Sequence, residues 1–237
     1  MFKVAYCAGH FLETPGKRVP EALDPAETRE WVLNDRVARF FNEAMLQYNG
    51  VETMRTDDST GKKDISIKNR TKSANEWGAD VYLDIHHNAA GRVFNGGGVV
   101  AYSYPKSAKG KEYRDAVYNA VIEAGKLRGN RSNPLHEKAY DSLKYSHAPA
   151  ILIEYGFMDS RMDYPIISTD AYAEAVGYAT ADGIAKVAGL EKKKPIDPKI
   201  MYRVQVGCYS KKSNAETVLK ALKNDGYDAI IKEEIIK

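Results

Sequence analysis

Two short and almost continuous apolar runs, Val81–His86 and Ala150–Glu154, most constrain how this chain can fold. Each has the length of a strand, and apolar runs without polar alternation are typical of strands covered on both faces. Similar short runs occur at residues 2–6, 51–55 and 98–102. Helical patterns fill the gaps, at residues 25–48, 65–77, 108–127 and 170–187. Strands that alternate with helices predict an α/β fold with a mostly parallel central sheet flanked by helices.

The first long helix has a predicted start in the sequence. Asp24 suits the N-cap, Pro25 suits the first helical position, and Glu27 falls where a capping box places its acidic residue. Gly50 follows the apolar stripe and suits the end of the element. We therefore expect this helix to begin at about Pro25.

The chain is expected to divide into three parts. Residues 1–189 hold the alternating strands and helices of the main domain. Residues 190–200 contain two prolines and a lysine run, which is typical of a linker. Residues 201–237 are predicted to form a small C-terminal β-α-β domain, which is short for independent stability.

The pattern within the C-terminal part supports this division. Apolar and polar residues alternate from Tyr202 to Cys208, as in a strand. Ser213 or Asn214 then suits the cap of a helix that ends at Gly226, and Tyr227–Ile231 is predicted to be a second strand.

Composition and charge narrow the class of protein. The 43% hydrophobic and 28% charged residues are ordinary for a soluble globular protein, and a net charge of +3 is too small to predict nucleic-acid binding. Residues 190–237 hold eleven Lys or Arg against seven Asp or Glu, so the basic charge lies there. This tail either contacts an acidic surface, such as a cell wall or membrane, or is simply a solvated Lys-rich domain. The two cysteines fall in different predicted domains, which argues against a disulfide framework.

Three polar residues are predicted at the carboxyl ends of strands, where open α/β sheets place their sites. His10 follows the first strand, and His86 and Glu154 end the two apolar runs. Glu30, on the first helix, shares a face with Asn34 and is expected to look toward the sheet. Two histidines and a carboxylate are a usual ligand set for catalytic zinc, and a second carboxylate suits proton transfer. Because the four residues are far apart in sequence, their spacing alone does not establish a zinc hydrolase.

Five segments around these residues carry a resemblance that covers residues 2 to about 189. They are AGH at Ala8–His10, EWVLN at Glu30–Asn34, RTDD at Arg55–Asp58, DIHHNA at Asp84–Ala89 and IEYGFMD at Ile153–Asp159. In this order they resemble the motifs of the zinc-dependent N-acetylmuramoyl-L-alanine amidases of the type 3 family. The resemblance implies that the chain cuts peptidoglycan between N-acetylmuramic acid and L-alanine. It also implies that His10, Glu30 and His86 bind Zn²⁺ and that Glu154 is the catalytic carboxylate.

The first motif departs from the family pattern. The family usually has Asp-Pro-Gly-His-Gly-Gly, and this chain has Cys7-Ala8-Gly9-His10-Phe11-Leu12. Cys7 stands where the family has a carboxylate behind the metal ligands, which leaves open what orients His10. Cys7 itself is either an additional soft ligand or a packed residue at the end of a buried strand.

Two neighbours compete with the predicted ligands. Glu27 is an alternative to Glu30, although its capping-box position already gives it a structural role. His87 follows His86, and because successive strand residues face opposite ways, only one of them can point at a shared metal. The motif selects His86, which leaves His87 to line the substrate groove or to face solvent.

The tail carries a second resemblance. YRVQVGCYS at residues 202–210 and SNAETVLKALKNDGYDA at residues 213–229 resemble one half of a SPOR (sporulation-related) domain. Such domains bind glycan strands stripped of peptide, and a complete one has two β-α-β units. The half-repeat either pairs with its copy in a second chain, giving a homodimer, or belongs to a truncated and weakly ordered tail.

Two other functions fit the same residues. The rivals to an amidase are a zinc peptidase that cuts the stem peptide and a cell-wall-binding module without catalysis. The sequence shows no pattern of a signal peptide or membrane span, so we expect the protein to be made in the cytoplasm. It would then reach the cell wall after lysis or through a holin-like pore, as a phage endolysin or a mother-cell autolysin.

Overall fold

The computed structural model describes residues 1–194 and 204–233 of the chain. It divides into two compact units, residues 1–193 and 194–237. The predicted linker at 190–200 begins within the first unit, because the backbones of Glu191 and Lys193 hydrogen-bond to those of Asn49 and Gln47. Residues 195–200 of that linker lie outside the described residues.

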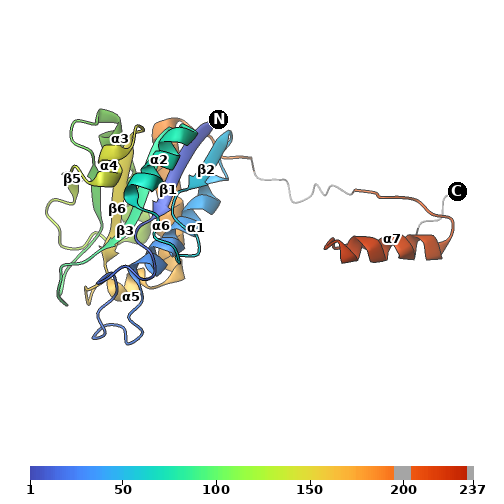
Figure 1. Cartoon of the computed structure of the whole chain (residues 1–237), viewed down its shortest axis with the longest axis horizontal. Helices are drawn as coiled ribbons and strands as arrows, with labels where there is room; N and C mark the ends of the chain where they lie inside the picture. The colour runs from blue at the N-terminus through green and yellow to red at the C-terminus, as the bar shows by residue number, and fades with distance from the viewer. Residues whose placement is uncertain (195–203, 234–237) are drawn as a thin grey trace. The chain divides into compact units, whose positions relative to one another are not determined.

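The first unit is built on one six-stranded sheet (Figure 1). Its strands are β1 (Phe2–Ala8), β2 (Val51–Arg55), β3 (Val81–Asn88), β4 (Val100–Ser103), β5 (Leu135–Glu137) and β6 (Ala150–Phe157). They lie in the order β2-β1-β3-β6-β4-β5, and only the β4–β6 pair is antiparallel. The sheet confirms the predicted mostly parallel α/β fold.

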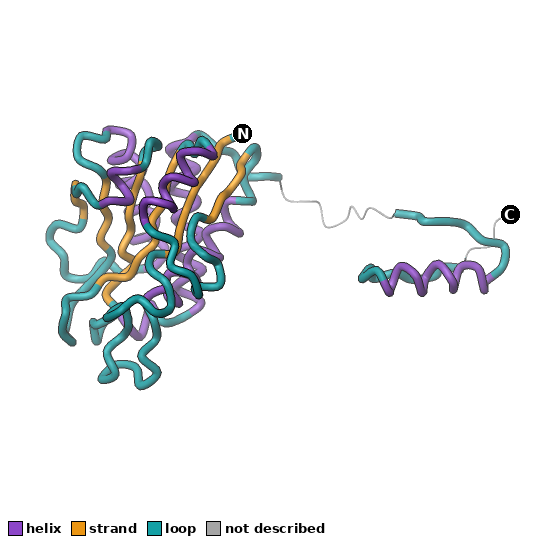
Figure 2. Tube along the Cα trace, viewed as in Figure 1, coloured by secondary structure: helices purple, strands orange, loops and turns teal. Residues whose placement is uncertain are grey.

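Helices cover both faces of this sheet (Figure 2). The larger layer holds α1 (Glu30–Met45), α3 (Ala108–Gly125) and α6 (Asp170–Ala188), with the short α5 (Tyr164–Ile167) beside α6. The smaller layer holds α2 (Ile67–Trp77) and α4 (Asp141–Tyr145). Alternate residues of β3 therefore meet different layers: Leu83 and Ile85 belong to the larger core, and Tyr82 belongs to the smaller one. Burial on both faces explains why this strand is almost continuously apolar.

The predicted start of the first helix is wrong. α1 begins at Glu30, and Asp24 instead accepts hydrogen bonds from Thr28 and from the hydroxyl of Tyr164. Glu27 has a φ of 48°, outside the helical region, and forms an ion pair with Arg18 at 3.1 Å. Residues 24–28 are therefore part of a loop that is fastened to α5.

The second unit contains one described helix, α7 (Lys212–Asn224). The two predicted strands are not seen in the part of this unit that the structure describes, since residues 204–208 and 227–231 are irregular. A strand needs a neighbour for its backbone hydrogen bonds, and the described chain offers none here. Val204, Val206, Tyr227 and Ile230 of these segments are all exposed. Residues 202 and 203 of the predicted first strand lie outside the described residues.

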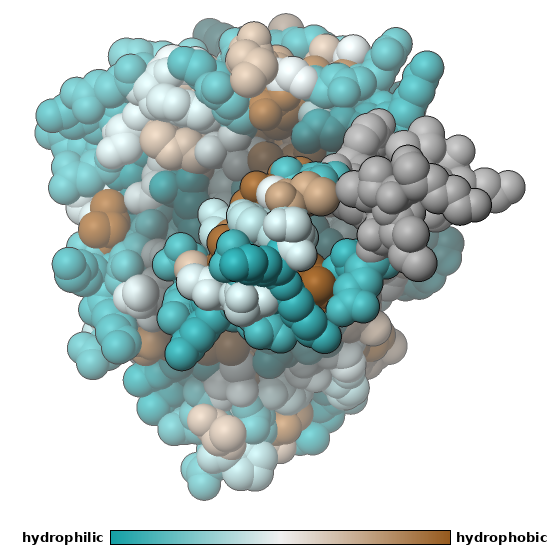
Figure 3. Space-filling view, turned by 90° about the vertical axis from the view of Figure 1, so that its right-hand side faces the viewer, coloured by the Kyte–Doolittle hydropathy of each residue, from teal (hydrophilic) through white to brown (hydrophobic). Residues whose placement is uncertain are grey.

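The surface of the protein is largely polar on the face shown in Figure 3. In the view of Figure 3, hydrophilic residues dominate and apolar residues occur in small scattered patches. Among the described residues, no helix combines the length and the apolar character that crossing a membrane requires.

Candidate active site

The sheet brings the four predicted residues together. His10 follows β1, His86 lies on β3, and Glu154 lies on β6 directly opposite His86 in the strand register. Glu30 is the first residue of α1, and it is completely buried. Parallel strands end at the same edge, so residues far apart in sequence meet there.

Three of these side chains form a group that can hold a metal ion. Glu30 Oε1 lies 3.0 Å from His86 Nδ1 and 3.4 Å from His10 Nε2. One ligand atom from each residue lies within 4.8 Å of the others. The second oxygen of Glu30, Oε2, is buried without a hydrogen-bond donor among the described residues, and it forms an ion pair with Nζ of Lys17 at 3.5 Å. Two imidazoles and a buried carboxylate whose ligand atoms converge fit a divalent ion such as zinc.

The charges within this group reinforce one another. Burial acts to raise the pKa of Glu30, but hydrogen bonds from His10 and His86 outweigh it and hold that pKa well below its ordinary value. Burial acts to lower the pKa of His86, but the carboxylates of Asp84 and Glu30 hold it well above its ordinary value. Without metal, the imidazole of His86 is therefore held in its positively charged form between the two carboxylates. A bound cation would replace that positive charge.

Glu154 has the properties of a general base. Its Oε2 atom is buried and has no hydrogen-bond partner in the described chain. Burial raises the pKa of Glu154 to about 7, with the positive charge of His86 opposing the shift. A carboxylate whose pKa lies near neutrality can both take up and release a proton under physiological conditions.

Comparison with known proteins decides the family. Residues 4–186 match the family described as N-acetylmuramoyl-L-alanine amidase (Amidase_3), which is more than half of the chain. The chain belongs to this family. The match confirms the predicted enzyme class, a hydrolase of the peptidoglycan amide bond that the family name describes.

Individual relatives agree with this assignment. The chain is 30% identical to the N-acetylmuramoyl-L-alanine amidase CwlM of Bacillus licheniformis over 195 residues, which is 80% of this chain and 70% of that protein. It is also 30% identical to the sporulation-specific N-acetylmuramoyl-L-alanine amidase of Bacillus subtilis (strain 168), over 78% of this chain and 68% of that protein. The crystal structure of an N-acetylmuramoyl-L-alanine amidase from Clostridium difficile 630 superposes with a TM-score of 0.71 at 22% identity. It covers 79% of this chain and 97% of the other, and shows the likeness of fold.

The loop that carries His10 is held by residues that the sequence did not reveal as functional. The buried Arg70, on α2, donates hydrogen bonds to the carbonyls of Ala8 at 2.9 Å and His10 at 2.7 Å. Asn34, on α1, donates to the carbonyl of Gly9 at 3.0 Å. His10 itself has a φ of 67°, which is unusual for a residue with a side chain. Contacts from α1 and α2 thus fix the loop backbone at the point from which the imidazole of His10 projects.

The alternatives to the predicted ligands lie in other surroundings. His87 of the enzyme is buried and bonds through Nδ1 to Asn34 Oδ1 at 2.8 Å, so it does not face solvent as one prediction had it. Glu27 pairs with Arg18 and lies outside the group of His10, Glu30 and His86 that could hold a metal ion. The thiol of Cys7 is buried and donates to Asp84, which favours the packed role over a ligand role.

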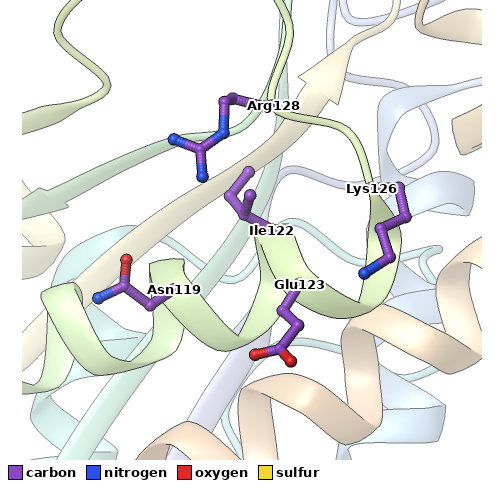
Figure 4. Close-up of a pocket in the computed structure, with 5 residues that line it drawn as sticks. All are labelled: Asn119, Ile122, Glu123, Lys126 and Arg128. Carbon is purple, nitrogen blue, oxygen red and sulfur yellow. The ribbon is translucent and has the colours of Figure 1, made fainter.

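Two hollows of the enzyme differ in their relation to this site. A cavity of about 370 Å³ is lined by His10 and His86 and reaches inward to Cys7, Tyr82 and Asp84. A second hollow, of about 470 Å³, lies on α3 and the segment after it, and is lined by Asn119, Ile122, Glu123, Lys126 and Arg128 (Figure 4). The second hollow is lined by none of the predicted site residues, whereas the first is lined by two of them, His10 and His86.

Proposed function

We propose that the enzyme hydrolyses the amide between N-acetylmuramic acid and L-alanine with a zinc ion held by His10, Glu30 and His86. The observation that carries this proposal is the convergence of their ligand atoms within 4.8 Å beside Glu154. Zinc, when bound, polarises a carbonyl and lowers the pKa of water. The substrate is bacterial peptidoglycan, and the proposed place of action is the cell wall, reached after lysis or through a pore.

The residues of the chain supply proton transfer and placement. Glu154 accepts a proton from the water that attacks the lactyl carbonyl, and donates it to the alanine nitrogen as the C–N bond breaks. Its pKa of about 7 suits both steps. Glu30 is buried and hydrogen-bonded to His86, so its carboxylate keeps one orientation while the amide bond of the substrate is broken.

A replacement of Glu154 tests these roles. Glu154→Gln keeps the size of the side chain and removes the base, so it should retain zinc and lose about 100-fold to 10,000-fold in turnover. Glu137→Gln is a matched control, because Glu137 ends β5 and is exposed. Bound zinc and the rate of peptide release from peptidoglycan are measured for both. A Glu154→Gln variant with near-normal turnover would remove Glu154 from the mechanism.

We further propose that the tail binds glycan strands and pairs with its copy in a second chain. The support is the exposure of Val204, Val206, Tyr227 and Ile230, whose backbones have no strand partner in the described chain. Two such copies would supply four strands, the number that a complete SPOR-type sheet requires. Sedimentation of the full chain against a chain that ends at Lys193 tests the pairing, and glycan pull-down tests the binding. If both chains sediment as monomers, the pairing is wrong.

A further inference from the structure

A buried carboxylate lies directly behind the proposed metal ligands. Asp84 and His86 are two residues apart on β3, so their side chains lie on the same face of the sheet. Asp84 Oδ1 is 3.1 Å from His86 Nε2, while the other ring nitrogen, Nδ1, faces Glu30 Oε1 at 3.0 Å. The imidazole of His86 is therefore held at both nitrogens, by one carboxylate on each side.

Asp84 is in turn held by its own neighbours. The thiol of Cys7 donates to Asp84 Oδ1 at 3.0 Å, and the hydroxyl of Ser142 also bonds to this carboxylate. Tyr82 lies 3.2 Å from the sulfur of Cys7 through its hydroxyl oxygen. All four side chains are buried, and these hydrogen bonds hold the carboxylate in position beside His86.

This arrangement determines which nitrogen of His86 can bind a metal. An imidazole that donates its Nε2–H to a carboxylate presents the lone pair of Nδ1. Nδ1 is the nitrogen that faces Glu30 and lies on the side of His10. We propose that Asp84 is a positioning residue, which fixes the tautomer and the ring orientation of His86 for zinc. The inference rests on the proposed function, because it assigns the zinc site its supporting carboxylate.

The register of the sheet explains how this chain manages without an aspartate at position 7. Cys7 on β1 and Asp84 on β3 are direct partners across the two strands. The Asp-Pro-Gly-His-Gly-Gly motif that the chain resembles begins with an aspartate, where this chain has Cys7. In this chain the carboxylate of the row stands on the neighbouring strand, at Asp84, and Cys7 donates a hydrogen bond to it.

The test uses four variants of the full chain. Asp84→Ser and Asp84→Asn remove the carboxylate, and Glu137→Gln is the matched control because it removes an exposed carboxylate outside the site. The double variant Cys7→Asp/Asp84→Ser exchanges the carboxylate back to β1. Zinc affinity is measured by competition with a chromophoric chelator, and thermal unfolding shows whether each variant is folded. Nitrogen-15 NMR of the histidine rings shows which nitrogen of His86 carries a protected proton, with and without zinc.

Asp84→Ser and Asp84→Asn are expected to weaken zinc binding by about 10-fold to 100-fold and to expose the Nε2 proton of His86 to exchange. Glu137→Gln should leave both unchanged, and the double variant should recover most of the lost affinity. A purely structural role for Asp84 would lower stability without moving the NMR signal of His86. That outcome, or wild-type zinc affinity in both Asp84 variants, would overturn the proposal.

The two proposals can fail separately. If the wild-type chain binds zinc but releases no peptide from peptidoglycan, the proposed function fails and the role of Asp84 is still decided by affinity and NMR. If the wild-type chain takes up no zinc, the protected Nε2 proton in the metal-free protein still tests whether Asp84 positions His86.

Discussion

Gly9 gives the sharpest prediction about how the site is built. A Cβ atom at this position would lie 2.1 Å from Cε1, 2.3 Å from Nε2 and 2.5 Å from Nδ1 of His86. The backbone of Gly9 is not in the left-handed region, so an alanine fits its conformation and only the new contact matters. The loop after β1 can therefore pass the imidazole of His86 only because residue 9 has no side chain.

The size of the effect follows from these distances. Ordinary contacts of a Cβ atom begin at 3.4 Å, so the ring of His86 or the loop must move by about 1.3 Å in the Gly9→Ala variant. The ring is held by Asp84 and Glu30, and the loop by Arg70, so neither can move without breaking hydrogen bonds. A displacement of about 1 Å typically costs about 100-fold in catalysis. We expect kcat/KM of Gly9→Ala to fall by about 100-fold or more, together with zinc affinity.

The assay compares two alanine variants of the same loop. Gly16 also lies between β1 and α1, but a Cβ atom there meets nothing within 4 Å. Its φ of 72° makes Gly16→Ala costly by about 1–2 kcal/mol in stability while the metal ligands stay in place. Both variants are measured for kcat/KM on a soluble muropeptide, for zinc affinity and for thermal unfolding. A Gly9→Ala variant with wild-type kcat/KM and zinc affinity would refute the packing of this loop against His86.

Three further predictions concern pH, the loop and the metal. In the metal-free protein, the folded-state pKa of Glu154 is about 7 and its ordinary value is 4.5, so the folded state binds more protons between these values and stability falls as pH rises through them. Thermal unfolding with chelator should therefore show Glu154→Gln gaining stability over the wild type from pH 4.5 to 7 and no further gain above; an advantage independent of pH would contradict this. Arg70→Lys removes the paired hydrogen bonds to the carbonyls of Ala8 and His10, so it should weaken zinc binding about 10-fold or more, as measured by chelator competition. Arg114, a buried arginine on α3, provides the control: Arg114→Lys should lower stability and leave zinc affinity unchanged. Zinc at 100 times its Kd should stabilise the folded chain by about 2.7 kcal/mol and raise its Tm by about 5–10 °C, and an unmoved Tm in calorimetry would contradict zinc binding to the folded state.

Much of the main domain could be predicted because its signals are local. The apolar runs of β3 and β6 reflect burial on both faces, and the alternation of strand residues separates His86 from His87. Parallel strands end at the same edge of a sheet, and this rule alone predicts that His10, His86 and Glu154 meet there. The meeting of these three side chains could therefore be predicted before their distances were known, whereas their roles as ligands and base were implied by the family resemblance and stay predictions.

Other features could not be predicted because distant contacts decide them. Asp24 has the sequence context of a helix cap, but its carboxylate bonds to Tyr164, which lies 140 residues later in the chain. β5 has only three residues, and it is a strand because β4 pairs with it. Arg70 acts on backbone carbonyls of another segment, and no local pattern indicates such a role. In the tail, the alternating pattern predicted strands, but the described chain supplies no partner to complete them.

Digestion of purified peptidoglycan, with and without a zinc chelator, followed by mass spectrometry of the fragments, tests the central claim most directly. The account predicts free peptides that begin with L-alanine together with glycan strands free of peptide, both abolished by the chelator and restored by zinc. Fragments cut within the stem peptide would contradict the assigned bond and indicate a zinc peptidase. Digestion that continues undiminished without metal would contradict the role of His10, Glu30 and His86, and binding to the wall without any release would contradict catalysis itself.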